Sequence, residues 1–150
     1  MTKVMLAWVH LLALGIGLGA IWVRARSFRG PLDGPGLRRL FAADSWWGVS
    51  AILWIGSGVW RLLAGTEKPT GYYLQNHVFW LKMSALVAIL LLEIAPMVAL
   101  IKWRVASARG TGVDVRPASR FATISYIQAV LVVIMVAAAT AMARGVGASR

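Results

Sequence analysis

A few side chains in the apolar stretches of this sequence could do chemistry. Two are the histidines His10 and His77, and two are the cations Arg61 and Lys82. A histidine in an apolar segment can bind a haem iron, and nearby cations can pair with the anionic propionates of haem. An aromatic side chain such as Trp80 could form the wall of such a site. The sequence therefore offers five candidate cofactor-binding residues, His10, Arg61, Trp80, Lys82 and His77, with His10 as the candidate metal ligand.

Glu93 and Gln128 form a second polar pair. Glu93 lies eight residues before Ile101, and Gln128 lies seven residues after Phe121. At 1.5 Å per residue, both lie roughly 11–12 Å from the same end of their two helices. We expect a hydrogen bond between them, because polar groups in a membrane need internal partners.

Four apolar stretches must position these residues, and they span about 4–23, 45–64, 78–101 and 121–142. Each is at least 20 residues long, which as a helix covers roughly 30 Å, the thickness of a bilayer core. The first stretch is too long for a signal peptide and is followed at once by Arg24-Ala25-Arg26. The alternation typical of barrel strands is missing. We predict an all-α protein, a four-helix transmembrane bundle in which residues 1–150 form a single domain.

The basic residues predict the orientation of the bundle. The chain has 16 Lys+Arg and 5 Asp+Glu, a net charge of +11, and no cysteine. Ten of the 16 basic residues fall in the expected connections 24–43 and 102–120. Basic connections remain in the cytoplasm, so both termini are expected on the periplasmic side of a bacterial inner membrane. This placement argues against nucleic acid as a partner and indicates the lipid bilayer instead.

The predicted orientation arranges the polar groups in layers. His10 would lie roughly 9 Å and Lys82 roughly 6 Å below the outer surface, and Arg61 about one turn from it. His77 would reach the depth of His10 only if its helix began near Tyr72. The alternative for Arg61 and Lys82 is that both extend to the interface as ordinary snorkelling side chains. His10 could equally form a hydrogen bond between helices.

Other residues suggest how the helices begin and pack. Asp44 is expected to cap the second span. Gly15 and Gly19, four residues apart, are expected to form a close contact between helices. Most tryptophans lie near the predicted helix ends, as in an aromatic belt: Trp8, Trp22, Trp46, Trp47, Trp60, Trp80 and Trp103.

Several motifs resemble those of an uncharacterised family of four-helix bacterial integral membrane proteins, a domain-of-unknown-function family. The matching features are His10, Asp44, Gly48, Gly58-Val59-Trp60-Arg61, Gly65-Thr66-Glu67-Lys68, the stretch from Tyr73 to Lys82, Pro96 and Ala141-Met142-Ala143-Arg144-Gly145. The most specific element is Asn76-x-x-Phe79-Trp80-x-Lys82. The resemblance implies a membrane location and no assigned reaction.

The first helix, with its histidine and basic exit, is also similar to that of HemJ-type haem-binding membrane proteins. In those proteins a histidine of the first helix holds haem b. The Leu-Pro-Arg-Leu-Phe motif at the exit of their first helix is replaced here by Val23-Arg24-Ala25-Arg26-Ser27-Phe28. The likeness implies His10 as the axial ligand.

Three functions follow from these residues. The first is a structural or accessory subunit of a larger membrane complex, or a homo-oligomer. The second is a redox protein that binds haem b or a porphyrin through His10. The third is a small oligomeric transporter or proton-coupled channel with Lys82 and Glu93 along its path. Hydrolase motifs such as Gly-x-Ser-x-Gly and His-Glu-x-x-His are missing, and whether the protein is an enzyme is left open.

Overall fold

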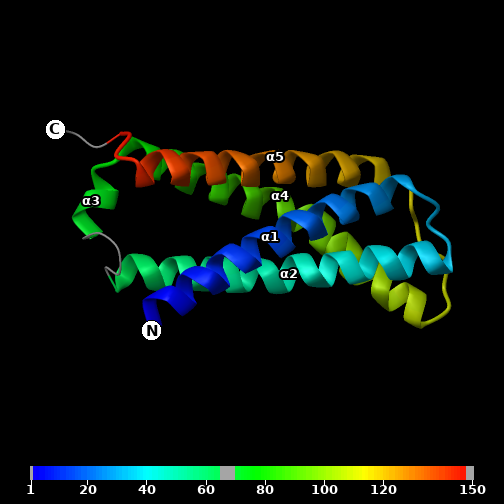
Figure 1. Ribbon diagram of the computed structural model, residues 1–150. Helices are drawn as coiled ribbons and strands as arrows, with labels where there is room; N and C mark the ends of the chain where they lie inside the picture. Colours follow the sequence, from blue (N-terminus) through cyan, green and yellow to red (C-terminus); the bar gives the residue numbers. More distant parts are fainter. Residues whose placement is uncertain (1, 65–69, 148–150) are drawn as a thin grey trace.

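The computed structural model describes residues 2–64 and 70–147. Within them the chain forms four long helices, α1 (Thr2–Arg29), α2 (Gly34–Leu63), α4 (His77–Ala108) and α5 (Ala118–Ala143), and a five-residue helix, α3 (Thr70–Leu74) (Figure 1). The described residues contain no strand. The predicted all-α helical bundle is therefore confirmed.

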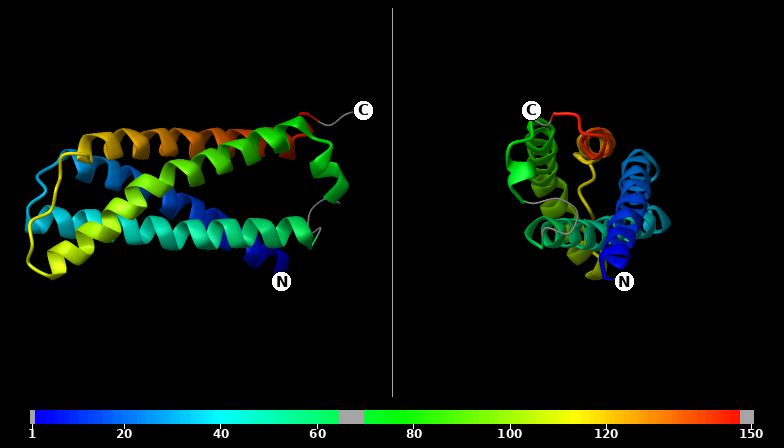
Figure 2. Two further views of the ribbon diagram at one scale, coloured as in Figure 1. Left: turned by 180° about the vertical axis from the view of Figure 1, so that it is seen from behind. Right: turned by 60° about the vertical axis from the view of Figure 1, so that its left-hand side comes forward.

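The long helices lie side by side. α1 packs against α2 and α5, and α5 packs against α4. The start of α1, the end of α5 and α3 lie at one end of the bundle, here called the terminal end (Figure 1). The links 30–33 and 109–117 lie at the opposite end, the loop end. α4 runs obliquely, beside α5 at the terminal end and across α2 at the loop end (Figure 2).

Three helices are long and apolar enough to cross a membrane: α1 from Val4 onward, α4 and α5. α2 contains the predicted span 45–64 but falls outside this set, because serines, glycines, tryptophans and Arg61 lower its hydropathy. A crossing by α2 therefore stays a prediction. Large apolar side chains cover the outside of all four long helices, as expected of surfaces that face lipid.

The helices extend beyond the predicted spans. α1 continues to Arg29 and α2 begins at Gly34, so most of the connection expected over 24–43 is helical. The expectation that Asp44 caps a helix is wrong. The N-cap is Asp33, whose carboxylate accepts a hydrogen bond from the Gly36 amide at 2.8 Å. Pro35 supports this start, because its ring suits the first helical turn.

Asn76 caps α4, a position at which asparagine is favoured, and accepts a hydrogen bond from the Val78 amide at 2.9 Å. Its amide nitrogen also donates to the Val146 carbonyl at 3.2 Å. Asn76 is thus fully buried between the start of α4 and the segment after α5. The specific Asn76 motif and the C-terminal motif of the family resemblance meet here, whereas Gly65-Thr66-Glu67-Lys68 lies outside the described residues.

The expected close contact at Gly15 and Gly19 is wrong within this chain. Both glycines are exposed, and a Cβ added to either would meet nothing within 4 Å. The close approach occurs instead at Gly17, where an added Cβ would lie 3.2 Å from the Ser50 Cβ of α2. Gly17 shares the buried face of α1 with Ala13, Ala20 and Ile21, since residues three or four apart lie on one face.

Two of the tryptophans assigned to an aromatic belt belong to the core instead. Trp47 and Trp103 are 4% and 6% exposed, respectively. Trp103 packs edge to face with Phe28 at a ring distance of 6.1 Å and lies 6.2 Å from Phe121, which forms an aromatic cluster at the loop end. The other five belt tryptophans are exposed: Trp8, Trp22, Trp46, Trp60 and Trp80.

Candidate functional site

The side chain of Arg24 lies at the centre of a polar cluster that joins all four long helices. Arg24 is in α1, one and a half turns before its end, and is fully buried. Its guanidinium donates to both oxygens of Glu93 in α4, at 2.6 Å (Nη1 to Oε1) and 2.7 Å (Nη2 to Oε2). It also donates to Asp44 Oδ1 of α2 at 3.0 Å. Two residues of α5 complete the set, Gln128 Oε1 at 2.9 Å and Ser125 Oγ at 3.2 Å. All five N–H donors of an arginine are thereby used.

The partners of Arg24 also bind one another. Glu93 Oε2 accepts from the Gln128 amide nitrogen at 2.8 Å and from the Trp47 indole at 3.1 Å. The same Gln128 nitrogen donates to the Ile89 carbonyl at 3.1 Å. The structure thus brings together Glu93 and Gln128, the pair that their matching depth predicts. Arg24, which joins them to α1, was not part of that prediction.

A second arginine completes the charge balance. Arg104 of α4 donates to Asp44 Oδ2 at 3.0 Å and to the Phe41 carbonyl at 2.7 Å. Two guanidinium groups therefore face two carboxylates, and the cluster is neutral when all four are ionised. Neutrality and complete hydrogen bonding are the two conditions under which charges can lie in a protein interior.

The assignment of Arg24 to a basic connection is therefore wrong. Arg24 follows Ala13, Gly17 and Ile21 on the buried face of α1 and precedes Phe28, one turn further on. The spacing of three or four residues was readable from the sequence. The side of α1 that faces the other helices was not, because large apolar residues also cover its exposed side. The Arg-Ala-Arg triplet suggested a membrane boundary because triplets of this kind flank many spans. Only Arg26 is exposed there.

His10 belongs to a separate, smaller cluster towards the terminal end. Its Nε2 accepts a hydrogen bond from the Trp54 indole of α2 at 3.1 Å. Its Nδ1 lies 2.9 Å from Ser57 Oγ, and the Ser57 hydroxyl donates to the Trp54 carbonyl at 3.1 Å. Because the indole can only donate, Nε2 carries no proton and Nδ1–H donates to Ser57. Gly58 makes room for the ring, since an added Cβ would lie 3.2 Å from the His10 Cε1.

The structure shows the alternative expected for His10, a hydrogen bond between helices. A haem iron needs the lone pair of a ring nitrogen, and in His10 that lone pair, on Nε2, already accepts the Trp54 proton. Among the described residues, no group of three or more His, Cys, Asp and Glu side chains could hold a metal ion.

The other candidate residues are spread over two helices. Arg61 lies one turn beyond Ser57 in α2 and is half-buried, as is Lys82 in α4. Trp80 is exposed, and its indole donates to the Leu74 carbonyl at 3.0 Å. His77 is the exposed first residue of α4. The condition for its use as a second ligand, a helix that begins near Tyr72, is not met, because α3 ends at Leu74 and α4 begins at His77.

Comparison with known proteins identifies a family. A family model described as "Predicted membrane protein (DUF2214)" matches residues 2–147. No curated protein and no solved structure matches the chain, so the likeness to HemJ-type proteins finds no support there. The match covers nearly the whole chain and includes every residue of the Arg24 and His10 clusters. The chain therefore belongs to the DUF2214 family of membrane proteins.

Proposed function

We propose that this membrane protein has no chemistry of its own and acts as an accessory subunit of a membrane complex or as a homo-oligomer. The observation that carries the proposal is the saturated Arg24 cluster. All five donors of Arg24 are bound to side chains of α2, α4 and α5. Arg24 and its carboxylate partners hold helices together, and none of the five Arg24 donors is left over for a substrate.

The transporter alternative is less well supported. It requires Lys82 and Glu93 to line one path, but Glu93 points into the cluster and accepts hydrogen bonds from three side chains, Arg24, Gln128 and Trp47. The two pockets described at the loop end are lined by none of the cluster residues. An ion path past Glu93 would have to break the ion pair with Arg24, which costs several kcal/mol, roughly 3–5 for a buried pair.

The orientation of the bundle is part of the proposal. The exposed basic residues Arg26, Arg29, Arg38, Arg39 and Arg109 lie at the loop end. We place this end in the cytoplasm of a bacterial inner membrane and both termini on the outer side, because connections rich in basic residues are retained inside. Reporters that are active only outside the membrane test this when fused after Arg150. Activity of a cytosolic reporter at that position would contradict the proposed orientation and support the opposite one.

The decisive experiment is native mass spectrometry of the protein, purified from its own host membranes in a mild detergent. We expect a multiple of the 16.2 kDa chain mass or a complex with a second protein. A monomer without any protein partner would contradict the proposal. An absorption spectrum of the same sample, after haem-replete expression, tests the haem b alternative. A Soret band lost in a His10→Ala variant would favour haem binding over an accessory role.

A further inference from the structure

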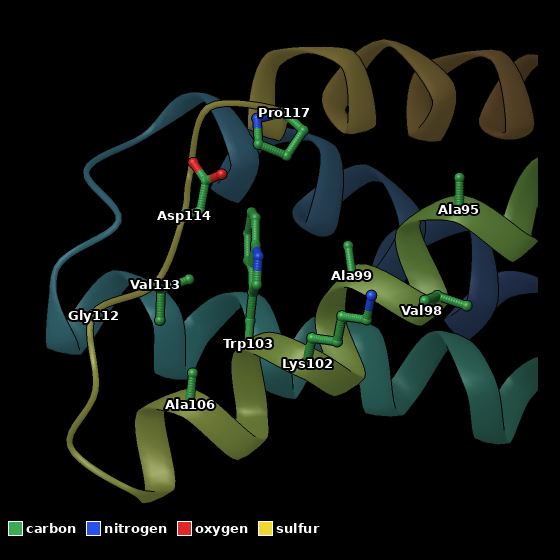
Figure 3. A pocket seen from close by; sticks show the side chains of 10 residues that line it. All are labelled: Ala95, Val98, Ala99, Lys102, Trp103, Ala106, Gly112, Val113, Asp114 and Pro117. Carbon is green, nitrogen blue, oxygen red and sulfur yellow. The ribbon is translucent and has the colours of Figure 1, made fainter.

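We propose that a pocket at the loop end binds one anionic phospholipid. The pocket has a volume of about 380 Å³ and lies between α4 and the link 109–117 (Figure 3). Ala95, Ala99 and Lys102 of α4 form one side, and Val113 and Asp114 of the link form the other. This inference depends on the membrane location of the chain and not on the proposed accessory role.

One wall of the pocket suits a hydrocarbon chain. Ala95, Ala99, Lys102 and Ala106 follow one another along one face of α4 at intervals of three or four residues. The three alanines leave a shallow apolar channel along the helix. Ala95 and its neighbour Val98 are exposed, so the channel opens towards the surrounding lipid. An acyl chain that enters the channel from the bilayer would exchange its contacts with other lipids for contacts with this wall.

The pocket also contains a donor that is open to a ligand. Trp103 is only 6% exposed, and its indole N–H donates to none of the residues that the structure describes. Because no buried nitrogen or oxygen atom of the described side chains lacks a partner, this N–H belongs to the small part of Trp103 that stays accessible. The indole stands between α4 and the link, in the middle of the pocket-lining residues (Figure 3). An indole N–H that faces a pocket can donate to an oxygen of a ligand.

Lys102, the neighbour of Trp103 in the sequence, supplies a positive charge to the same pocket lining. Within residues 2–64 and 70–147, its ammonium group takes part in no hydrogen bond or ion pair, and it lines the same pocket. An ammonium and an N–H group together suit a phosphate, whose oxygens accept strong hydrogen bonds from cations. A phosphate joined to acyl chains fits a pocket that is polar on one side and open to lipid on the other.

The carboxylate in the lining does not repel such a ligand strongly. Asp114 is paired with Arg116, which donates from Nε to Oδ1 and from Nη2 to Oδ2, each at 2.8 Å. The exposed Arg120 nearby adds positive charge at the same end. Clusters of this kind attract anionic lipids at the cytoplasmic surface, whereas zwitterionic lipids gain little from them.

The test is a lipid titration of the detergent-solubilised protein, followed by native mass spectrometry. Phosphatidylglycerol and phosphatidylcholine with identical acyl chains serve as probes. We expect one phosphatidylglycerol per chain to bind at least about fivefold more tightly than phosphatidylcholine, and Lys102→Gln to remove most of this preference. Trp103→Phe, which deletes the N–H but keeps an aromatic ring, should weaken phosphatidylglycerol binding.

Two further variants keep the result interpretable. Arg109→Gln removes an exposed charge outside the pocket and should change the affinity by less than about twofold. Ala95→Leu narrows the channel from its open side and should weaken both lipids without unfolding the protein, since Ala95 is exposed. Equal binding of the two lipids would overturn the proposal. Equal losses in Lys102→Gln and Arg109→Gln would overturn it in favour of general attraction of anionic lipids to the basic surface.

Discussion

Arg24 of α1 and Glu93 of α4 form a bidentate ion pair in the protein core, with N···O distances of 2.6 and 2.7 Å. They are 69 positions apart in the sequence, and Arg24 is fully buried while the Glu93 side chain is 19% exposed. The pair fixes the position of the oblique helix α4 relative to α1. Each of the two charges neutralises the other, as a charge in a protein core requires.

Removing one charge of this pair should destabilise the bundle strongly. Glu93→Gln leaves a buried guanidinium with one carboxylate fewer, and Arg24→Gln leaves Glu93 without its cation. We expect each change to lower the free energy of unfolding by roughly 3–5 kcal/mol, because an uncompensated charge then stays in the core. The double variant Arg24→Gln/Glu93→Gln should lose less than the sum of the two. Thermal unfolding in detergent, followed by circular dichroism, measures all three.

The exposed pair Arg116–Asp114 provides the control for this experiment. Its side chains are 89% and 58% exposed, so water already solvates both charges. Arg116→Gln should leave the unfolding temperature unchanged. Losses that are strictly additive in the Arg24 and Glu93 variants would show that the two side chains do not stabilise each other.

His10 should be a neutral imidazole with its proton on Nδ1. The Trp54 indole donates to Nε2, and Nδ1 lies 2.9 Å from the Ser57 hydroxyl. Nitrogen-15 NMR of histidine-labelled protein at neutral pH distinguishes the two tautomers. Trp54→Phe removes the indole donor and should shift the population towards the Nε2–H form. The exposed His77 serves as the internal reference, and a dominant Nε2–H signal from His10 in the unaltered protein would contradict the hydrogen-bond assignment.

Asp114 should remain ionised in acid well below the usual range of a carboxyl group. The side-chain hydrogen bonds from Arg116, helped by the Arg116 backbone amide, lower the pKa of Asp114 from 3.8 to about 2. Because the folded-state pKa is depressed, the small local stabilisation of the link by this exposed pair is present above pH 3.8 and is lost as the pH falls through about 2. Carboxyl carbon NMR follows this titration directly. Arg116→Ala should return the pKa towards 3.8, and an unchanged value in that variant would exclude Arg116 as the cause.

Gly17 and Gly19 should respond oppositely to enlargement. Gly17→Leu places a side chain against Ser50 and Trp47, where an added Cβ already lies 3.2 Å from the Ser50 Cβ. We expect a loss of roughly 1–3 kcal/mol from overpacking. The side chain added in Gly19→Leu would point into open space. We expect the unfolding temperature of the monomeric bundle to change by no more than about two degrees. Equal losses in the two variants would contradict the packing of α1 on α2.

The helical content and the approximate spans could be predicted from the sequence because both depend on local properties. A stretch such as 121–142 is apolar enough by its own composition to form a membrane helix, and α5 covers it. Asn76 was predictable as a cap because its side chain reaches only the next turn. The hydrogen bond between Glu93 and Gln128 could be predicted because both residues lie at a similar distance from the ends of their helices, and these ends could be estimated from the sequence.

The side chains on other helices that bind Arg24 could not be predicted from the sequence alone. The atoms that bind Arg24 belong to residues 20, 69, 101 and 104 positions away, and their meeting depends on how each helix is rotated and tilted. The same triplet, Arg24-Ala25-Arg26, would flank a span or enter the core depending on that rotation. Hydropathy and helix length depend on residues that are neighbours in the sequence. The sequence by itself therefore determined that this is a helical membrane protein. Only the tertiary structure decided that Arg24 is the buried centre of the protein core, because its charge can be buried there only when three other helices bring partners to it.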